Sequence, residues 1–197
     1  AKGGEEARHF FHTEYRLNHL LFSYPKPIAA FMDGITMGGG VGLALPAKYR
    51  VATENTRFAM PEAGIGLFPD VGGGWFLPRL EGRVGVYLAL TGARIKGPDC
   101  LALGLATHYI AADALDDLKA AITANPADLA KLLDEAATDA PPAGITADLP
   151  RINALFASDR LEDIISALRA DDSEWAAKQL ESLLNKSPQT CKVTLRQ

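Results

Sequence analysis

Cysteine and histidine are scarce in this 197-residue chain, which contains two cysteines and four histidines. Both residues are common metal ligands, and cysteine also forms disulfides. Cys100 and Cys191 lie far apart, and the histidines have no spacing typical of metal ligands. No apolar run is long enough to cross a membrane, and the first residues, AKGGEEARHF, do not make a signal peptide. We therefore expect neither a structural metal nor a disulfide, and no membrane partner.

An excess of positive charge is also missing, since the formal net charge is -4 and the pI is about 5.6. Without a basic field, binding to nucleic acid or to an anionic membrane is disfavoured. With 48% hydrophobic and 22% charged residues, the composition is that of a globular protein with enough length for one substantial core. We expect a soluble, intracellular protein.

The first 110 residues alternate between helical and strand patterns. Apolar residues at helical intervals predict a helix from Glu5 to Tyr24, which Pro25 and Pro27 end. Strands are predicted at 28–32 and 49–53, with a short helix at 41–45 between them and further helices near 84–90 and 98–103. We assign residues 1–110 to an α/β core.

Residues 111–197 are rich in alanine and leucine, with charged residues between them at helical spacing. Helices are predicted at 115–123, 127–137 and 161–184. The stretch at 138–150, TDAPPAGITADLP, contains prolines and a glycine that disfavour regular structure, so we interpret it as a linker. We therefore assign residues 111–197 to a helical C-terminal region, and no internal repeat is visible.

The stretch MDGITMGGGVGL, residues 32–43, places five glycines between positions 34 and 42, directly after a predicted strand. No lysine follows as in a Walker A loop, and the GxGxxG spacing is not met. A glycine turn that opens an apolar helix leaves free N–H groups at the positive end of the helix dipole, which suits an anion or oxyanion site. Close packing of helix on strand explains the same glycines about equally well.

Two carboxylates, Glu62 and Asp70, lie in a loop at 61–74 that prolines and glycines break up. The loop is able to fold back and bring them together. Apolar neighbours such as Ile65 and Trp75 would raise the pKa of a carboxylate and suit it to acid or base work. The alternatives are solvated carboxylates, or an Asp70 that caps a helix at 75–80.

Three long motifs resemble the enoyl-CoA hydratase/isomerase (crotonase) superfamily, and within it the 3-hydroxyisobutyryl-CoA hydrolases. They are GITMGGGVGL, FAMPEAGIGLFPDVGGGWFLPRL and LTGARIKGPDCLALGLATH. The resemblance runs through the whole chain and is strongest at 15–109. It implies an α/β fold of the ClpP/crotonase type, a spiral of β-β-α units followed by a helical region.

The resemblance also implies roles for individual residues. Gly39 matches the glycine whose N–H holds the thioester oxygen, and Glu62 matches the acid/base or nucleophilic carboxylate. Asp70 and Glu14 match residues that line the site and contact substrate in the hydrolase branch. Hydratases carry a second catalytic glutamate where Gly42 stands here, which favours a hydrolase.

The implied function is hydrolysis of an acyl-CoA thioester, by an anhydride at the carboxylate or by an activated water. CoA belongs to the substrate, no separate cofactor is implied, and a homo-oligomer is compatible with the family. The alternatives are enoyl-CoA hydratase or isomerase chemistry, and a catalytically idle CoA-binding module. The family's first strands and last helices lack counterparts in this chain, so we expect an incomplete site and an exposed apolar face at 28–31.

Overall fold

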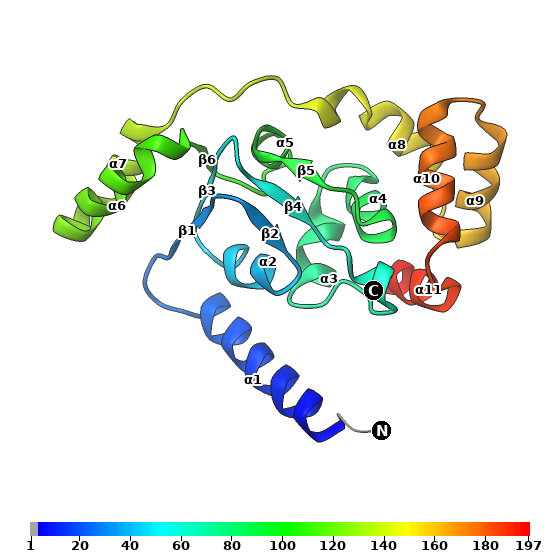
Figure 1. Cartoon of the computed structure of the whole chain (residues 1–197), viewed down its shortest axis with the longest axis horizontal. Helices are drawn as coiled ribbons and strands as arrows, with labels where there is room; N and C mark the ends of the chain where they lie inside the picture. Colours follow the sequence, from blue (N-terminus) through cyan, green and yellow to red (C-terminus); the bar gives the residue numbers. More distant parts are fainter. Residues whose placement is uncertain (1–3) are drawn as a thin grey trace.

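The computed structural model describes residues 4–197 and places two small sheets at the centre, with helices around them (Figure 1). The helices are α1 Gly4–Phe22, α2 Gly39–Ala44, α3 Gly73–Phe76, α4 Val84–Thr91, α5 Gly97–Ala102, α6 Leu115–Ala124, α7 Leu129–Ala136, α8 Leu149–Leu155, α9 Leu161–Ala170, α10 Glu174–Leu184 and α11 Pro188–Arg196. The strands are β1 Ala29–Met32, β2 Ile35–Met37, β3 Tyr49–Ala52, β4 Arg57–Ala59, β5 Ile95–Lys96 and β6 His108–Tyr109. Short 3₁₀ helices are η1 Glu62–Ile65, η2 Leu77–Arg79, η3 Ala112–Ala114, η4 Pro126–Asp128 and η5 Gly144–Ala147.

The two sheets arise from a repeated β-β-α pattern. β1 and β3 pair in parallel, and β6 adds to β3 to complete one sheet. β2 and β4 pair in parallel in the other sheet, and β5 adds antiparallel to β4. β1–β2 and β3–β4 therefore each contribute their first strand to one sheet and their second strand to the other, whereas β5 and β6 lie on either side of α5 and enter the sheets in the reverse order. The chain must turn sharply between the two sheets, as it does at Gly34, where φ is +112°.

The strands and helices predicted in the first part of the chain are present, with boundaries shifted by at most two residues. The predicted helix at 5–24 is α1, and the predicted helix at 41–45 is α2, which begins two residues earlier at Gly39. The second sheet and β6 were not predicted. Their strands have two or three residues, too few for an alternating pattern to be recognised.

The outer face of the first sheet is covered by α6 and α7. A small apolar cluster, centred on Val51, Ile110 and Leu133, joins β3 to these helices, and Phe31 packs against it. The prediction of an exposed apolar face at 28–31 was therefore wrong, because these four residues are half-buried. Exposed apolar side chains are found instead on α1, where Phe10 is 59% and Phe22 is 62% exposed, and none of the residues of this helix is buried.

The helical C-terminal region is confirmed from η3 onward, but it shares a core with the sheets. Ile164 of α9, Ala176 of α10 and Cys191 of α11 belong to the same buried cluster as Phe58 of β4. The linker prediction at 138–150 was wrong in its second half, where η5 and the start of α8 form and the buried Ile145 donates its N–H to Asp99. Of the helices between residues 4 and 197, none combines the length and hydrophobicity that a bilayer crossing requires.

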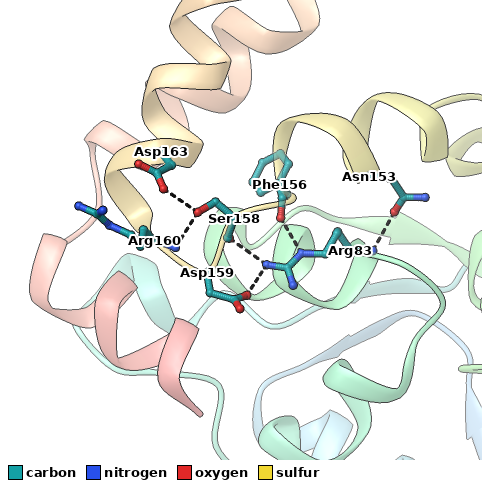
Figure 2. Close-up of polar contacts among 7 residues, drawn as sticks. All are labelled: Arg83, Asn153, Phe156, Ser158, Asp159, Arg160 and Asp163. Atoms are coloured by element: carbon teal, nitrogen blue, oxygen red, sulfur yellow. Dashed lines mark hydrogen bonds and ion pairs between the residues drawn. The ribbon is translucent and has the colours of Figure 1, made fainter.

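Arg83, just before α4, fastens the α8–α9 connection to the core (Figure 2). Its Nε donates to the carbonyl of Phe156 at 2.6 Å, and its Nη2 donates to the carbonyl of Ser158 at 2.9 Å. Nη2 also pairs with Asp159 at 2.8 Å, and the backbone N–H of Arg83 donates to Asn153 Oδ1. One side chain thus satisfies two carbonyl groups that follow the end of a helix, where intrahelical partners run out.

We expect Arg83→Met to lower the free energy of unfolding by about 2–3 kcal/mol, because two main-chain carbonyls lose a charged donor. Asp159 is 84% exposed, so Asp159→Asn should cost less than about 0.5 kcal/mol. Urea unfolding of both variants measures the difference. Equal losses would show that the ion pair, and not the carbonyl contacts, holds this connection.

Candidate active site

The glycine triplet forms the turn that opens α2. Gly38, the N-cap, has φ +51° and ψ -121°, a conformation that side chains disfavour, and no side chain caps the helix. The carbonyl of Gly38 accepts from Val41 and Gly42, while the N–H of Gly39 has no hydrogen-bond partner within residues 4–197. A backbone donor without an intramolecular partner therefore stands at the start of α2.

Glu62 is the buried carboxylate of the site. It follows β4 at the start of η1, only 5% of its surface is exposed, and its Oε2 has no partner within the described residues. Its Oε1 lies 3.0 Å from the place a Cβ would occupy on Gly38, which puts the carboxylate against the glycine turn. Burial is the main cause that raises the pKa of Glu62 to about 7, and the nearby charge of Asp70 is a smaller cause in the same direction.

α1 brings two further groups to the same turn. Glu14 Oε1 lies 2.9 Å from the place a Cβ would occupy on Gly39, so a side chain at position 39 would collide with it. The next residue, Tyr15, donates its hydroxyl to Asp70 Oδ2 at 2.8 Å. Burial, and then the charge of Asp70, raise the pKa of Glu14. Glu14 and Glu62 therefore lie at the N-terminal end of α2, and Asp70 is close enough for its charge to act on both.

The loop that carries Asp70 rests directly on α2 at Gly42. A Cβ at position 42 would lie 2.5 Å from the Cβ of Val71, which leaves no room for any side chain there. Val71 has φ +43° and is the one non-glycine residue at positive φ among residues 4–197. β-branched residues rarely adopt this conformation, so the contact is held against a conformational cost.

Two expectations about this loop need correction. Asp70 does not cap the following helix, because α3 has Gly72 as its N-cap and no side-chain cap, while the Asp70 carboxylate binds Tyr15. Ile65 and Trp75 do not surround the carboxylates, since they are 82% and 53% exposed. Burial of Glu62 comes from the glycine turn and the core.

A pocket of about 520 Å³ opens between α1 and α2, beside these groups. Glu14 and Gly39 line it together with apolar side chains, among them Phe10, Leu17 and Leu43. A mostly apolar cleft with a few convergent polar groups is the usual form of a small-molecule site. No set of three or more His, Cys, Asp or Glu within residues 4–197 is arranged to hold a metal ion.

Three features of the site were not predicted: the hydrogen bond of Tyr15, the positive φ of Val71 and the contact of Val71 with Gly42. Tyr15 stands next to Glu14 in the motif EYRLN, and its place on a helix edge gave no sign of the partner it meets 55 residues later. The close contact at Gly42 had a signal, since a glycine inside an apolar helix often marks a close approach.

Known proteins resemble this chain along nearly its whole length. The family model for enoyl-CoA hydratase/isomerase matches residues 1–197. The chain is 47% identical over 205 residues to the mitochondrial 3-hydroxyisobutyryl-CoA hydrolase of Xenopus tropicalis, with 99% of this chain and 53% of that protein covered. It is 45% identical over 197 residues to the human protein of the same name, with 95% and 51% covered. The chain thus spans about half the length of the curated relatives it matches.

Solved structures also share the fold. A carnitinyl-CoA dehydratase from Mycobacterium thermoresistibile superposes with a TM-score of 0.93 at 40% identity, covering 99% of this chain and 57% of that one. An enoyl-CoA hydratase from Rhodobacter sphaeroides 2.4.1 superposes with a TM-score of 0.89 at 38% identity, covering 98% and 56%. The expected crotonase-type spiral is confirmed, and the chain belongs to the enoyl-CoA hydratase/isomerase family.

Proposed function

We propose that the protein containing this chain hydrolyses an acyl-CoA thioester, with 3-hydroxyisobutyryl-CoA as its preferred substrate. The observation that carries this proposal is a buried carboxylate, Glu62, with a pKa of about 7, held beside a free N–H at the start of α2. A group with this pKa is half ionised near neutrality and works well as a base or nucleophile. The names of the relatives at 45–47% identity support the choice of substrate.

In the proposed reaction the N–H of Gly39 donates to the thioester oxygen as negative charge builds on it. The ionised Glu62 either attacks the carbonyl carbon, so that an anhydride forms and the CoA thiolate leaves, or removes a proton from an attacking water. Water completes both routes, and the products are the carboxylic acid and CoA. Asp70, fixed by Tyr15, and Glu14 contact the polar end of the acyl group. No cofactor is required beyond the CoA that the substrate carries.

Hydratase chemistry is the second candidate, because the structural relatives at 38–40% identity carry dehydratase and hydratase names. Addition of water to an enoyl group in the family uses a second glutamate at the position of Gly42. In this chain Val71 fills the space that a side chain at position 42 would need, so no second carboxylate fits there without movement of the loop. The geometry at Gly42 therefore supports hydrolysis over hydration.

For the cellular location, we propose mitochondria in a eukaryote and the cytoplasm in a bacterium.

A paired assay on the natural gene product that contains these residues tests the proposal. We expect release of CoA from 3-hydroxyisobutyryl-CoA to be at least about a hundredfold faster than loss of the enoyl absorbance of crotonyl-CoA, because the second acid of a hydratase is missing. Comparable rates would contradict the assignment as a hydrolase. Absence of both reactions, with retained binding of CoA esters, would favour the idle CoA-binding module.

A further inference from the structure

Asn18, on α1, is a buried polar residue near the site that no step above employs. Both its Nδ2 and its Oδ1 are shielded from solvent and lack a hydrogen-bond partner within residues 4–197. Buried amides are nearly always paired, because an unpaired one is destabilising. The amide therefore requires a partner that the described chain does not supply, and this holds whichever way the amide is turned.

The position of Asn18 ties it to the candidate active site. It follows Glu14 by four residues and Tyr15 by three, so all three lie on one side of α1. A Cβ at Gly42 would lie 3.2 Å from Asn18 Oδ1, which places the amide beside the bare part of α2. Asn18 also lines a pocket of about 640 Å³ together with Val71 and Gly72, the two residues that follow Asp70. The amide thus lies where α1, α2 and the Asp70 loop meet.

The chemistry of the neighbouring groups leaves a gap that an amide fills. An ionised carboxylate only accepts hydrogen bonds, so Glu14 and Asp70 bind the hydrogen of a substrate hydroxyl but give nothing to its oxygen. The hydroxyl hydrogen of Tyr15 is already donated to Asp70. Asn18 brings two N–H donors. A hydroxylated acyl group needs one donor and one acceptor, and the amide with one of these carboxylates supplies both.

The two arginines that line the pocket beyond Asn18 are engaged elsewhere. Arg50 donates to the main-chain carbonyls of Ala47, Gly104 and Leu105. The guanidinium of Arg79 lies 3.3 Å from the ring centroid of Trp75 and donates to the carbonyl of the same residue. Asn18 is therefore better placed than either arginine to donate a hydrogen bond to a ligand beside Gly42.

We propose that Asn18 donates a hydrogen bond to the hydroxyl group of the substrate's acyl chain and so selects hydroxylated CoA thioesters. This role rests on the proposed function, because it requires the acyl group to enter between α1 and the Asp70 loop. It makes Asn18 a specificity-determining residue, distinct from Glu62, which acts on the thioester itself.

Asn18→Leu tests the role, since leucine has a similar branched shape without polar atoms. For this variant we expect kcat/KM with 3-hydroxyisobutyryl-CoA to fall about tenfold, the effect of one neutral hydrogen bond, while kcat/KM with isobutyryl-CoA changes less than about twofold. In the absence of substrate, the Tm of the variant should equal or exceed that of the wild type, because an unpaired buried amide has been removed. Arg16→Leu, at an exposed position on the same helix, controls for added apolar surface and should change none of these quantities.

Equal losses of kcat/KM on the two substrates, or a lowered Tm for Asn18→Leu, would overturn the role, because the amide would then serve the fold. Failure of the proposed function gives a different result, in which the wild type hydrolyses neither thioester. Calorimetry then decides about Asn18. The role is supported if Asn18→Leu binds 3-hydroxyisobutyryl-CoA with a tenfold weaker Kd and isobutyryl-CoA with an unchanged Kd. It is contradicted if the ratio of these two Kd values is the same in the variant and the wild type.

Discussion

Glu62→Gln should lower the rate of thioester hydrolysis by about a thousandfold or more while leaving the fold intact. Loss of a positioned base typically costs 10²–10⁴ in rate, and a nucleophile has no substitute at all. Glutamine keeps the size of the side chain and its place against Gly38. Turnover is measured as CoA released from 3-hydroxyisobutyryl-CoA, and circular dichroism verifies the fold.

Glu81→Gln, at an exposed position, is the matched control and should keep wild-type turnover. Near wild-type turnover by Glu62→Gln would remove Glu62 from the mechanism.

The stability of the same variant reports on the pKa of Glu62. The folded protein holds a proton on Glu62 up to about pH 7, whereas the ordinary pKa is 4.5, so the free energy of unfolding decreases as pH rises between these values. Glu62→Gln should therefore be up to about 3 kcal/mol more stable than wild type at pH 8, and equally stable at pH 4.

Gly42→Ala should lower both stability and activity, because its Cβ would lie 2.5 Å from the Cβ of Val71. Overpacking of this kind costs about 1–3 kcal/mol, and relief requires the loop of Asp70 to move. A displacement of about 1 Å in a catalytic group is able to cost a hundredfold in rate. We expect a loss of that order in kcat/KM for the hydroxylated substrate.

Gly40→Ala is the matched control, since it lies in the same helix and a Cβ there meets nothing within 4 Å. Alanine is the better helix former by about 1 kcal/mol, so this variant should be as stable as wild type or more so, with turnover within about threefold of wild type. Unfolding midpoints and kcat/KM of both variants give the comparison. Similar behaviour of the two variants would show that the contact with Val71 does not position the loop.

Most helices were predictable from sequence because their apolar residues recur over eight or more positions, as in α1, α6 and α9. The second sheet was not predictable. β2 and β4 have three residues each, and their pairing is imposed by the spiral in which one strand of each pair enters the other layer. The repeat therefore exists in the backbone and not in the sequence.

The candidate residues of the site could be proposed from the sequence, but the contacts that arrange them could not. Glu62, Asp70, Glu14 and Gly39 stand in long motifs, and their roles in the reaction stay a prediction, although Glu14 and Glu62 lie against the glycine turn of α2. The sequence DVGGG does not indicate that Val71 adopts positive φ, because valine disfavours that conformation. The Tyr15–Asp70 hydrogen bond joins residues 55 positions apart and depends on where α1 lies, which only the tertiary fold determines.

The dependence of kcat/KM on pH for hydrolysis of 3-hydroxyisobutyryl-CoA tests most directly whether Glu62 carries the reaction. CoA release is quantified by chromatography, so that the titration of a thiol reagent does not enter the result. Because the pKa of Glu62 is about 7 and its ionised form is the reactive one, kcat/KM should rise about tenfold per pH unit below pH 7 and level off above it. A profile that is flat from pH 5.5 to 8.5, or one that falls across this range, would contradict the assignment of Glu62 as the reacting carboxylate.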